Sequence, residues 1–293
     1  MADLLQNVVS GLAAGSIYGA LALALVFVFR STGVVNFAQG EMAMISTYFA
    51  VSILTLGAPL GVAIAGAIAG SFVFGMVIER TLIRPLEGRA DHAASILTVG
   101  LFLAFNGIAG WLWGVSPRTF PSIFPNSNVE ILGARVAVES LGTIAVLLAC
   151  VGLLFLFFER TRTGLMMRAA ALNPSSSRLA GVPVNRLLMG GWGLAAAVGA
   201  LAGALIAPSV FVSPGMMGAV FIYALAAAAL GGLDSPLGAV LGGWIIGVVE
   251  TMAANEIGFI GADLKILVPL VIIFLVLLAR PAGLLGTPEV ARV

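Results

Sequence analysis

The sequence has little charge and few of the side chains that build metal or redox sites. Of its 293 residues, 9% are charged, and it holds one cysteine, Cys150, and one histidine, His92. A lone cysteine excludes an internal disulfide and a cysteine-based metal cluster, and a lone histidine is poor grounds for a metal site. The formal net charge of +1 lacks the basic excess of nucleic-acid-binding proteins. No Ser-His-Asp or paired-carboxylate arrangement is present, so we expect no catalytic residues and no metal site.

The sequence has long apolar segments instead. Hydrophobic residues make up 60% of the chain and the mean hydropathy is +1.13, well above the roughly 45–50% apolar content of soluble domains. Residues 4–29, 42–78 and 187–233 contain no acidic or basic residue, and a helix needs about 20 apolar residues to cross a bilayer. The first helix lacks the basic start of a signal peptide and is expected to be retained. The 37 glycines are expected to let helices pack closely in lipid.

We therefore expect an all-α polytopic membrane protein with about eight to ten transmembrane helices in one domain, residues 1–293. Two of nine apolar segments are weak, the second because it starts in a polar stretch and the seventh because it is short. Either is a full span or a half-helix. The nine segments are 5–29, 38–56, 58–78, 93–114, 139–158, 187–211, 217–232, 236–254 and 262–280.

The arginines predict the orientation, since short cytoplasmic loops collect Lys and Arg. The loops at 79–92 and 159–186 and the tail from 280 carry most of them, and we expect all three in the cytoplasm. The loop at about 115–138 holds two arginines and an alternating pattern that predicts a small external hairpin. If all nine segments cross the membrane, the N-terminus lies outside; an even count places it in the cytoplasm.

Helix start and stop signals divide the arginine-rich segment 159–186. Thr163 is predicted to cap a helix over about 164–172, and Asn173 followed by Pro174 is predicted to start a second one. Gly181 and Pro183 are expected to end it.

Arg160, Gly164 and Arg168 recur at a spacing of four residues, which favours one face of a helix. Two short amphipathic helices of this kind are suited to docking in a groove of a soluble partner. The alternative is that the arginines only fix topology and touch anionic lipid headgroups.

Three blocks of this sequence resemble the branched-chain amino acid ABC-transporter permeases, the LivH-type half of a high-affinity importer. "VVNFAQGEMAMIS" at 34–46 is similar to a signature at the start of that family's second membrane segment. "ALAAAALGGLDSPLGAVLGGWIIGVVE" at 224–250 is similar to its Gly-Gly block and the helix that follows. The third block resembles its cytoplasmic coupling segment and comprises Arg160, Gly164, Arg168, Ala169, Ala180, Gly181, Val182 and Arg186.

The resemblance implies a permease subunit of a bacterial inner-membrane importer that passes branched-chain or related amino acids delivered by a periplasmic binding protein. The chain has no phosphate-binding G-x-x-x-x-G-K-S/T loop, so we expect no cofactor in it. ATP and Mg are expected in two separate ATP-binding subunits, beside a homologous LivM-type permease. Membrane lipid is an expected partner and nucleic acid is not. The residues expected to couple the chain to the ATPases are Arg160, Arg162, Gly164, Arg168, Ala180, Gly181 and Arg186.

Two other transport functions stay open at this point. Urea and short-amide permeases share the same three blocks, so the substrate class is not fixed. A secondary transporter driven by an ion gradient would need paired ionisable groups near the middle of the membrane. Glu41 and Glu250 lie too near the ends of their predicted segments for that role. A channel or a membrane enzyme would need a selectivity filter or a catalytic constellation, and neither is found.

Asn36, Gln39 and Glu41 are the candidate residues of the translocation path. They form a polar stretch at the start of an apolar segment, and charges within a membrane usually face a cavity or a partner. The alternative is that Glu41 is stabilised at a helix N-terminus and pairs with Arg30. Glu250 is either part of the rim on which the binding protein docks or a solvated helix end.

Overall fold

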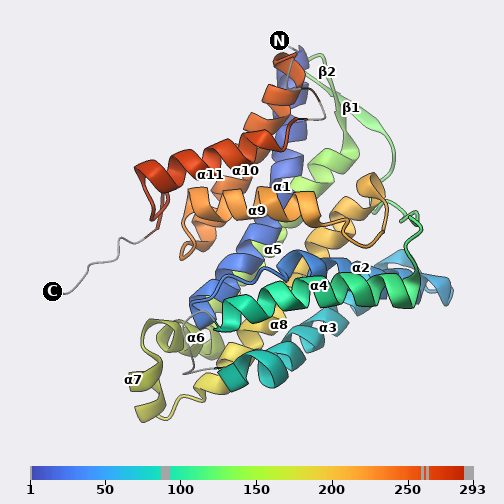
Figure 1. Ribbon diagram of the computed structural model, residues 1–293. Helices are drawn as coiled ribbons and strands as arrows, with labels where there is room; N and C mark the ends of the chain where they lie inside the picture. The colour runs from blue at the N-terminus through green and yellow to red at the C-terminus, as the bar shows by residue number, and fades with distance from the viewer. Residues whose placement is uncertain (1, 87–92, 259–260, 262–263, 287–293) are drawn as a thin grey trace.

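The computed structural model describes residues 2–86, 93–258, 261 and 264–286, and shows a bundle of helices with one small hairpin (Figure 1). Each of the nine predicted apolar segments contains a helix, which confirms the all-α class. These helices are α1 (Ala2–Thr32), α2 (Gln39–Thr55), α3 (Leu60–Ile78), α4 (Ala93–Trp113), α5 (Val138–Arg160), α8 (Val184–Val210), α9 (Gly218–Gly231), α10 (Pro236–Glu256) and α11 (Leu267–Ala279). A π-helical turn η1 (Glu79–Ile83) and a 3-10 turn η2 (Arg84–Leu86) extend α3.

The described helices fall into two length classes. Six are long and apolar enough to cross a membrane: α1, α3 with its extension, α4, α5, α8 and α10. The helices α2, α9 and α11 have 17, 14 and 13 residues, which at about 1.5 Å per residue span roughly 20–25 Å of a hydrocarbon core about 30 Å thick. The structure therefore has six full-length candidate spans, and three shorter helices that the prediction of eight to ten spans counted with them.

Helix α1 forms the centre of the bundle and packs against α10, α8, α9 and α5 (Figure 1). Its contact with α10 is made through glycine. A Cβ atom on Gly15 would lie 2.4 Å from the carbonyl oxygen of Gly243, and one on Gly247 would lie 2.3 Å from that of Gly11. The two backbones therefore touch, as in helix pairs within lipid that associate through small residues.

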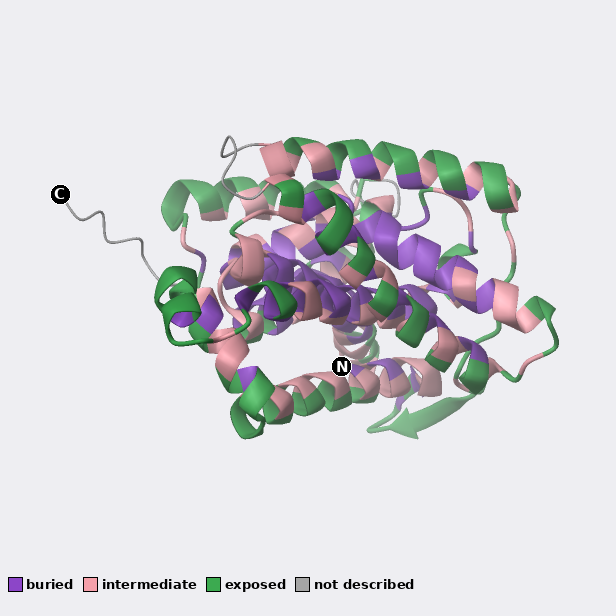
Figure 2. Ribbon diagram, turned by 90° about the horizontal axis from the view of Figure 1, so that it is seen from below, coloured by how far each residue is buried: buried purple, intermediate pink, exposed green. Residues whose placement is uncertain are grey.

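The outer helices carry apolar side chains on their exposed faces. Figure 2 shows the buried residues gathered in the middle of the bundle and exposed residues on the helices around it. The exposed side chains include Leu103 of α4, Phe155 of α5 and Phe274 of α11, each more than half accessible. Apolar outer surface on this scale is expected for a multi-pass membrane protein whose backbone is paired within helices.

The predicted hairpin is present, with strands β1 (Asn128–Ile131) and β2 (Ala134–Ala137) pairing antiparallel; its external side stays a prediction. Leu132 and Gly133 make its turn with φ of 51° and 81°, as a two-residue hairpin of matching twist requires. Strand β2 packs against α1, and the hairpin lies beside the N-terminus, at the end of the bundle opposite α6 (Arg162–Leu172) and α7 (Pro174–Leu179) (Figure 1). The N-terminus and the arginine-rich helices thus lie at opposite ends of the bundle, and the assignment of the arginine-rich end to the cytoplasm stays a prediction.

Candidate functional site

The arginine-rich segment forms two short helices, but the first one starts earlier than predicted. Thr161 has an extended backbone, and its Oγ1 accepts a hydrogen bond from the Gly164 amide at 3.0 Å. The expectation that Thr163 caps this helix is therefore wrong, because the chain leaves α5 at Thr161 and α6 already begins at Arg162. Arg160 ends α5, so the four-residue spacing of Arg160, Gly164 and Arg168 runs over two helices and not along one face.

The second helix begins and ends as predicted. The Asn173 Oδ1 accepts a hydrogen bond from the Ser176 amide at 2.9 Å, and Pro174 occupies the first helical position. Helix α7 ends at Leu179, and Gly181 follows with a φ of +79°. This left-handed conformation favours glycine, which explains why the stop signal is read correctly from the sequence.

Gly164 and Arg168 fix the angle between α5 and α6. A Cβ atom on Gly164 would lie 2.3 Å from the carbonyl oxygen of Phe157, so only glycine lets α6 lie against the end of α5. The Arg168 Nη1 is 2.5 Å from the Glu159 Oε1. Both residues are thus engaged within the chain, and their role toward ATPases stays a prediction. The other predicted coupling residues are exposed: Arg160, Arg162, Ala180, Gly181 and Arg186.

Three large apolar side chains on α6 and α7 are also exposed. Leu165 is 61% accessible, Leu172 is 84% and Leu179 is 92%, while the opposite side of α6 is buried on α8 through Ala170 and Leu187. We name the exposed leucines, together with Arg160, Arg162 and Arg186, the coupling surface. A basic surface with exposed leucines beyond the membrane-spanning helices is suited to binding another protein.

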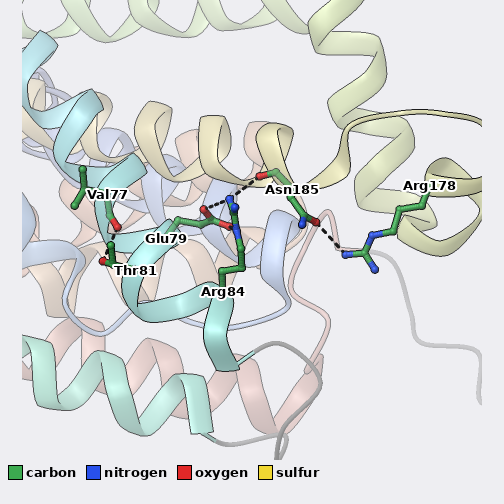
Figure 3. Close-up of polar contacts among 6 residues, drawn as sticks. All are labelled: Val77, Glu79, Thr81, Arg84, Arg178 and Asn185. Atoms are coloured by element: carbon green, nitrogen blue, oxygen red, sulfur yellow. Dashed lines mark hydrogen bonds and ion pairs between the residues drawn. The ribbon is translucent and has the colours of Figure 1, made fainter.

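A buried ion pair connects α3 to this region (Figure 3). Glu79 is fully buried, and its carboxylate accepts hydrogen bonds from Arg84 at 2.6 and 3.1 Å. The Arg84 Nη2 also donates to the backbone oxygen of Asn185 at 3.0 Å, and the Arg178 Nη2 donates to the Asn185 Oδ1 at 3.3 Å. The start of α8 therefore links α7 to the end of α3.

Sequence reasoning missed this link, because Arg80 and Arg84 were used only as topology signals. The sequence does hold a signal for this ion pair. Glu79 lies five residues before Arg84, and both follow a long apolar run. Arg89 and His92 were part of the same loop, and they lie outside the described residues.

The predicted path residues lie where α2 begins, and all three are buried. The Asn36 Nδ2 donates to the Gln39 Oε1 at 3.0 Å, and the Gln39 Nε2 donates to the backbone oxygen of Ala195 in α8 at 3.1 Å. These two amides therefore join the start of α2 to α8.

Glu41 is 1% accessible, and the side chain of Asn106 in α4 lies near its carboxylate. One carboxylate oxygen of Glu41 is buried without a partner among the described residues. Glu41 lies in the first turn of α2, as the alternative expects for a carboxylate at a helix N-terminus. The expected pair with Arg30 is wrong, because no ion pair joins the two residues in the part of the chain that the structure describes. Asn106 was not found by sequence reasoning, and the assignment of Asn36, Gln39 and Glu41 to the path stays a prediction.

Glu250 is 3% accessible, so the expectation of a solvated helix end is wrong. Its Oε1 lies 3.2 Å from the Nζ of Lys265, and its Oε2 accepts a hydrogen bond from the Tyr18 hydroxyl at 3.5 Å. Tyr18 stacks on Tyr223 with ring centroids 4.6 Å apart. Helices α1, α9 and α10 and the segment before α11 thus meet around one carboxylate. Glu250 was not predicted to be buried, because it lies near the end of its apolar segment.

Comparisons with known proteins show the family of this chain. Residues 7–277 match the family model described as "Branched-chain amino acid transport system / permease component". The chain belongs to this family. The permease is 31% identical to the high-affinity branched-chain amino acid transport system permease protein BraD of Pseudomonas aeruginosa, an alignment that covers 99% of this chain and 98% of BraD.

Two further comparisons cover nearly the whole permease. It is 29% identical to the branched-chain amino acid permease protein LivH of Escherichia coli over 99% of this chain and 97% of LivH. Among solved structures, it is similar to a chain of PsaBC from Streptococcus pneumoniae in complex with Fab, at 16% identity, with 95% and 92% of the two chains covered and a TM-score of 0.46. The family resemblance of the three sequence blocks is therefore confirmed, and the chain is a multi-pass permease subunit of an ABC importer.

Proposed function

We propose that this permease imports branched-chain amino acids across a bacterial inner membrane, receiving them from a periplasmic binding protein. ATP hydrolysis in two separate ATP-binding subunits, which hold ATP and Mg, drives the cycle, and a second LivM-type permease completes the path. The substrates named for BraD and LivH, both aligned over nearly their whole length, support this choice of solute.

The coupling surface is the observation that carries the proposal. A permease without a phosphate-binding loop needs a surface on which a separate motor acts. Leu172 and Leu179, 84% and 92% accessible, project from α6 and α7 at the arginine-rich end of the bundle. Burial of one leucine side chain contributes about 1.5–3 kcal/mol, so these two side chains can contribute much of the affinity for a docked subunit.

The contacts of Asn185 give this surface a connection to the membrane helices. A subunit that pulls on α7 acts on Arg178, which is bonded to Asn185 in the first turn of α8. The backbone of the same residue holds Arg84 at the end of α3. We infer that α3 and α8, which pack against each other, move with α7 when nucleotide closes the ATPases.

The test replaces one exposed leucine at each end of the molecule. Leu179→Asp places a charge on the coupling surface, and Leu132→Asp does the same in the external hairpin, where Leu132 is 91% accessible. We expect Leu179→Asp to lose most of the copurifying ATP-binding subunits and Leu132→Asp to retain them. The readouts are subunit stoichiometry and ATPase activity of the reconstituted complex, with and without binding protein loaded with leucine.

The outcomes test the ATP-driven mechanism and the proposed substrate separately. Equal subunit retention in the two variants contradicts the coupling surface. Stimulation of ATPase activity by binding protein loaded with urea or a short amide, and not with leucine, keeps the importer and overturns the proposed substrate. Leucine uptake that persists without ATP-binding subunits and follows an ion gradient would overturn the ATP-driven mechanism.

A further inference from the structure

A cavity of about 260 Å³ lies between α6 and the ends of the membrane helices on the arginine-rich side. Its walls come from α1, α5, α6, α8 and the start of α10, and most of the lining is apolar. Leu23 and Phe27 of α1 and Leu154 of α5 form the deep part, while Arg30 and Arg168 lie at the level of the helix ends. The transport function described above does not use this cavity.

The polar groups of the cavity leave a positive charge without a counterion. Arg30 lies in the last turn of α1, and within the described residues its guanidinium has no hydrogen bond and no ion pair. Arg168 is paired with Glu159 through Nη1, but its Nε is buried and has no hydrogen-bond partner in the described part of the chain. Arg30 and Arg168 carry two positive charges, and Glu159 neutralises one of them. One positive charge therefore remains without a counterion, and one buried N–H group remains without a hydrogen-bond acceptor, among the described residues.

The depth of the cavity matches a molecule with an anionic head and an apolar body. Arg30 follows Leu23 by seven positions along α1, which is about 10 Å of helix. The charged level is thus where phospholipid headgroups lie if the arginine-rich end faces the cytoplasm, and the apolar wall continues from it into the hydrocarbon region.

We propose that this cavity binds an anionic phospholipid of the inner leaflet. Its phosphate accepts hydrogen bonds from Arg30 and from the Nε of Arg168, and one acyl chain lies along Leu23, Phe27 and Leu154. Because Arg168 and Ala171 of α6 form part of the wall, the bound lipid also holds α6 in place behind the coupling surface. A segment of a soluble subunit is a poorer occupant, since the deep part of the site is enclosed by helices that cross the membrane.

The test measures lipid retention, which is independent of the solute and of ATP hydrolysis. The permease, purified in detergent with the subunits that accompany it, is stripped of lipid and incubated with phosphatidylglycerol or phosphatidylcholine. Bound lipid is then counted by native mass spectrometry. Arg30→Gln removes the unpaired charge, and Ala171→Phe fills the apolar space without a change in charge. Arg80→Gln is the matched control, because Arg80 is exposed on the same end of the molecule, outside the cavity.

We expect the wild type and Arg80→Gln to retain phosphatidylglycerol in preference to phosphatidylcholine. Arg30→Gln should weaken that binding about fivefold, the typical contribution of one basic residue near an anionic surface, and Ala171→Phe should abolish it. Undiminished retention in both cavity variants overturns the proposal. Loss in Arg30→Gln with full retention in Ala171→Phe also overturns it, because the lipid then binds at the arginine without entering the cavity. Retention that appears only after the ATP-binding subunits are removed assigns the cavity to those subunits instead.

Discussion

The ammonium group of Lys265 lies 3.2 Å from the carboxylate of Glu250, and this is the chain's one lysine. Glu250 is buried between helices, whereas the lysine side chain is 44% accessible. The pair therefore brings a cation from the outer part of the molecule to a carboxylate that the membrane helices would otherwise leave without a counterion.

Lys265→Met should destabilise the protein more than Glu250→Gln does. The first variant leaves a buried carboxylate without its cation, whereas the second leaves a neutral amide that still accepts the Tyr18 hydrogen bond. We expect a cost of about 1–3 kcal/mol for Lys265→Met, measured by thermal unfolding in detergent. Arg280→Met, which removes an exposed cation, is the control. Equal unfolding temperatures for Lys265→Met and Arg280→Met contradict the prediction.

Gly15→Ala should disrupt the packing of α1 on α10. The added Cβ would meet the Gly243 carbonyl at 2.4 Å, whereas a Cβ on Gly100 meets no atom within 4 Å. We expect Gly15→Ala to cost about 1–3 kcal/mol, as overpacking of a close interface does, and Gly100→Ala to be neutral or slightly stabilising. The yield of folded protein and its unfolding temperature in detergent report the difference. A Gly15→Ala protein as stable as Gly100→Ala shows that the two helices do not touch.

Arg84→Met should lower the stability of the protein, whereas Asn185→Ala should affect only the coupling of ATP hydrolysis to transport. Arg84→Met leaves Glu79 buried without its guanidinium partner, and we expect a cost of about 3–5 kcal/mol. Asn185→Ala removes only the side-chain bond to Arg178 and keeps the backbone oxygen that binds Arg84.

Asn185→Ala should therefore fold and bind ATP-binding subunits normally, yet transport fewer molecules of solute per ATP hydrolysed. The measurements are unfolding temperature, subunit stoichiometry and the ratio of uptake to hydrolysis in proteoliposomes. An unchanged ratio in Asn185→Ala would show that the Arg178 contact carries no force between α7 and α8.

Thr161→Ala should fray the first turn of α6, and Thr163→Ala should not. Only the Thr161 hydroxyl accepts the Gly164 amide, and loss of such a cap costs about 1 kcal/mol. Hydrogen exchange over residues 162–168 measures the effect locally, with faster exchange expected in Thr161→Ala alone. Faster exchange in Thr163→Ala alone would restore the cap that the sequence predicts.

The sequence predicts the elements of this permease better than it predicts their contacts. The apolar segments, the hairpin turn at Leu132 and Gly133, and the helix start at Asn173 all follow from local propensity, because period, turn geometry and capping depend on neighbouring residues. The cap at Thr161 was missed because Thr161 and Thr163 are both suitable capping residues and lie two positions apart. The packing of Gly164 on α5 decides between them.

The candidate sites depend on tertiary contacts that local patterns do not contain. One alternative paired Glu41 with Arg30, six residues before the polar stretch begins, but the polar side chain near its carboxylate is Asn106 of another helix. A solvated helix end was one alternative for Glu250, from its position near a segment end, but the side chain is buried and pairs with Lys265, which lies beyond the end of its helix. The periodicity of one segment does not predict which residue of another segment will lie opposite to it in the fold.

The glycine contact between α1 and α10 has a consequence for the order in which the protein is assembled. Gly11 and Gly15 leave the ribosome more than 200 residues before Gly243 and Gly247 do. During that interval the first helix is in the membrane while the backbone that it will touch has not been made. Its bare glycine face must therefore be occupied by lipid, by helices made before α10 or by the insertion machinery, and native burial of the central helix is completed only after α10 is made.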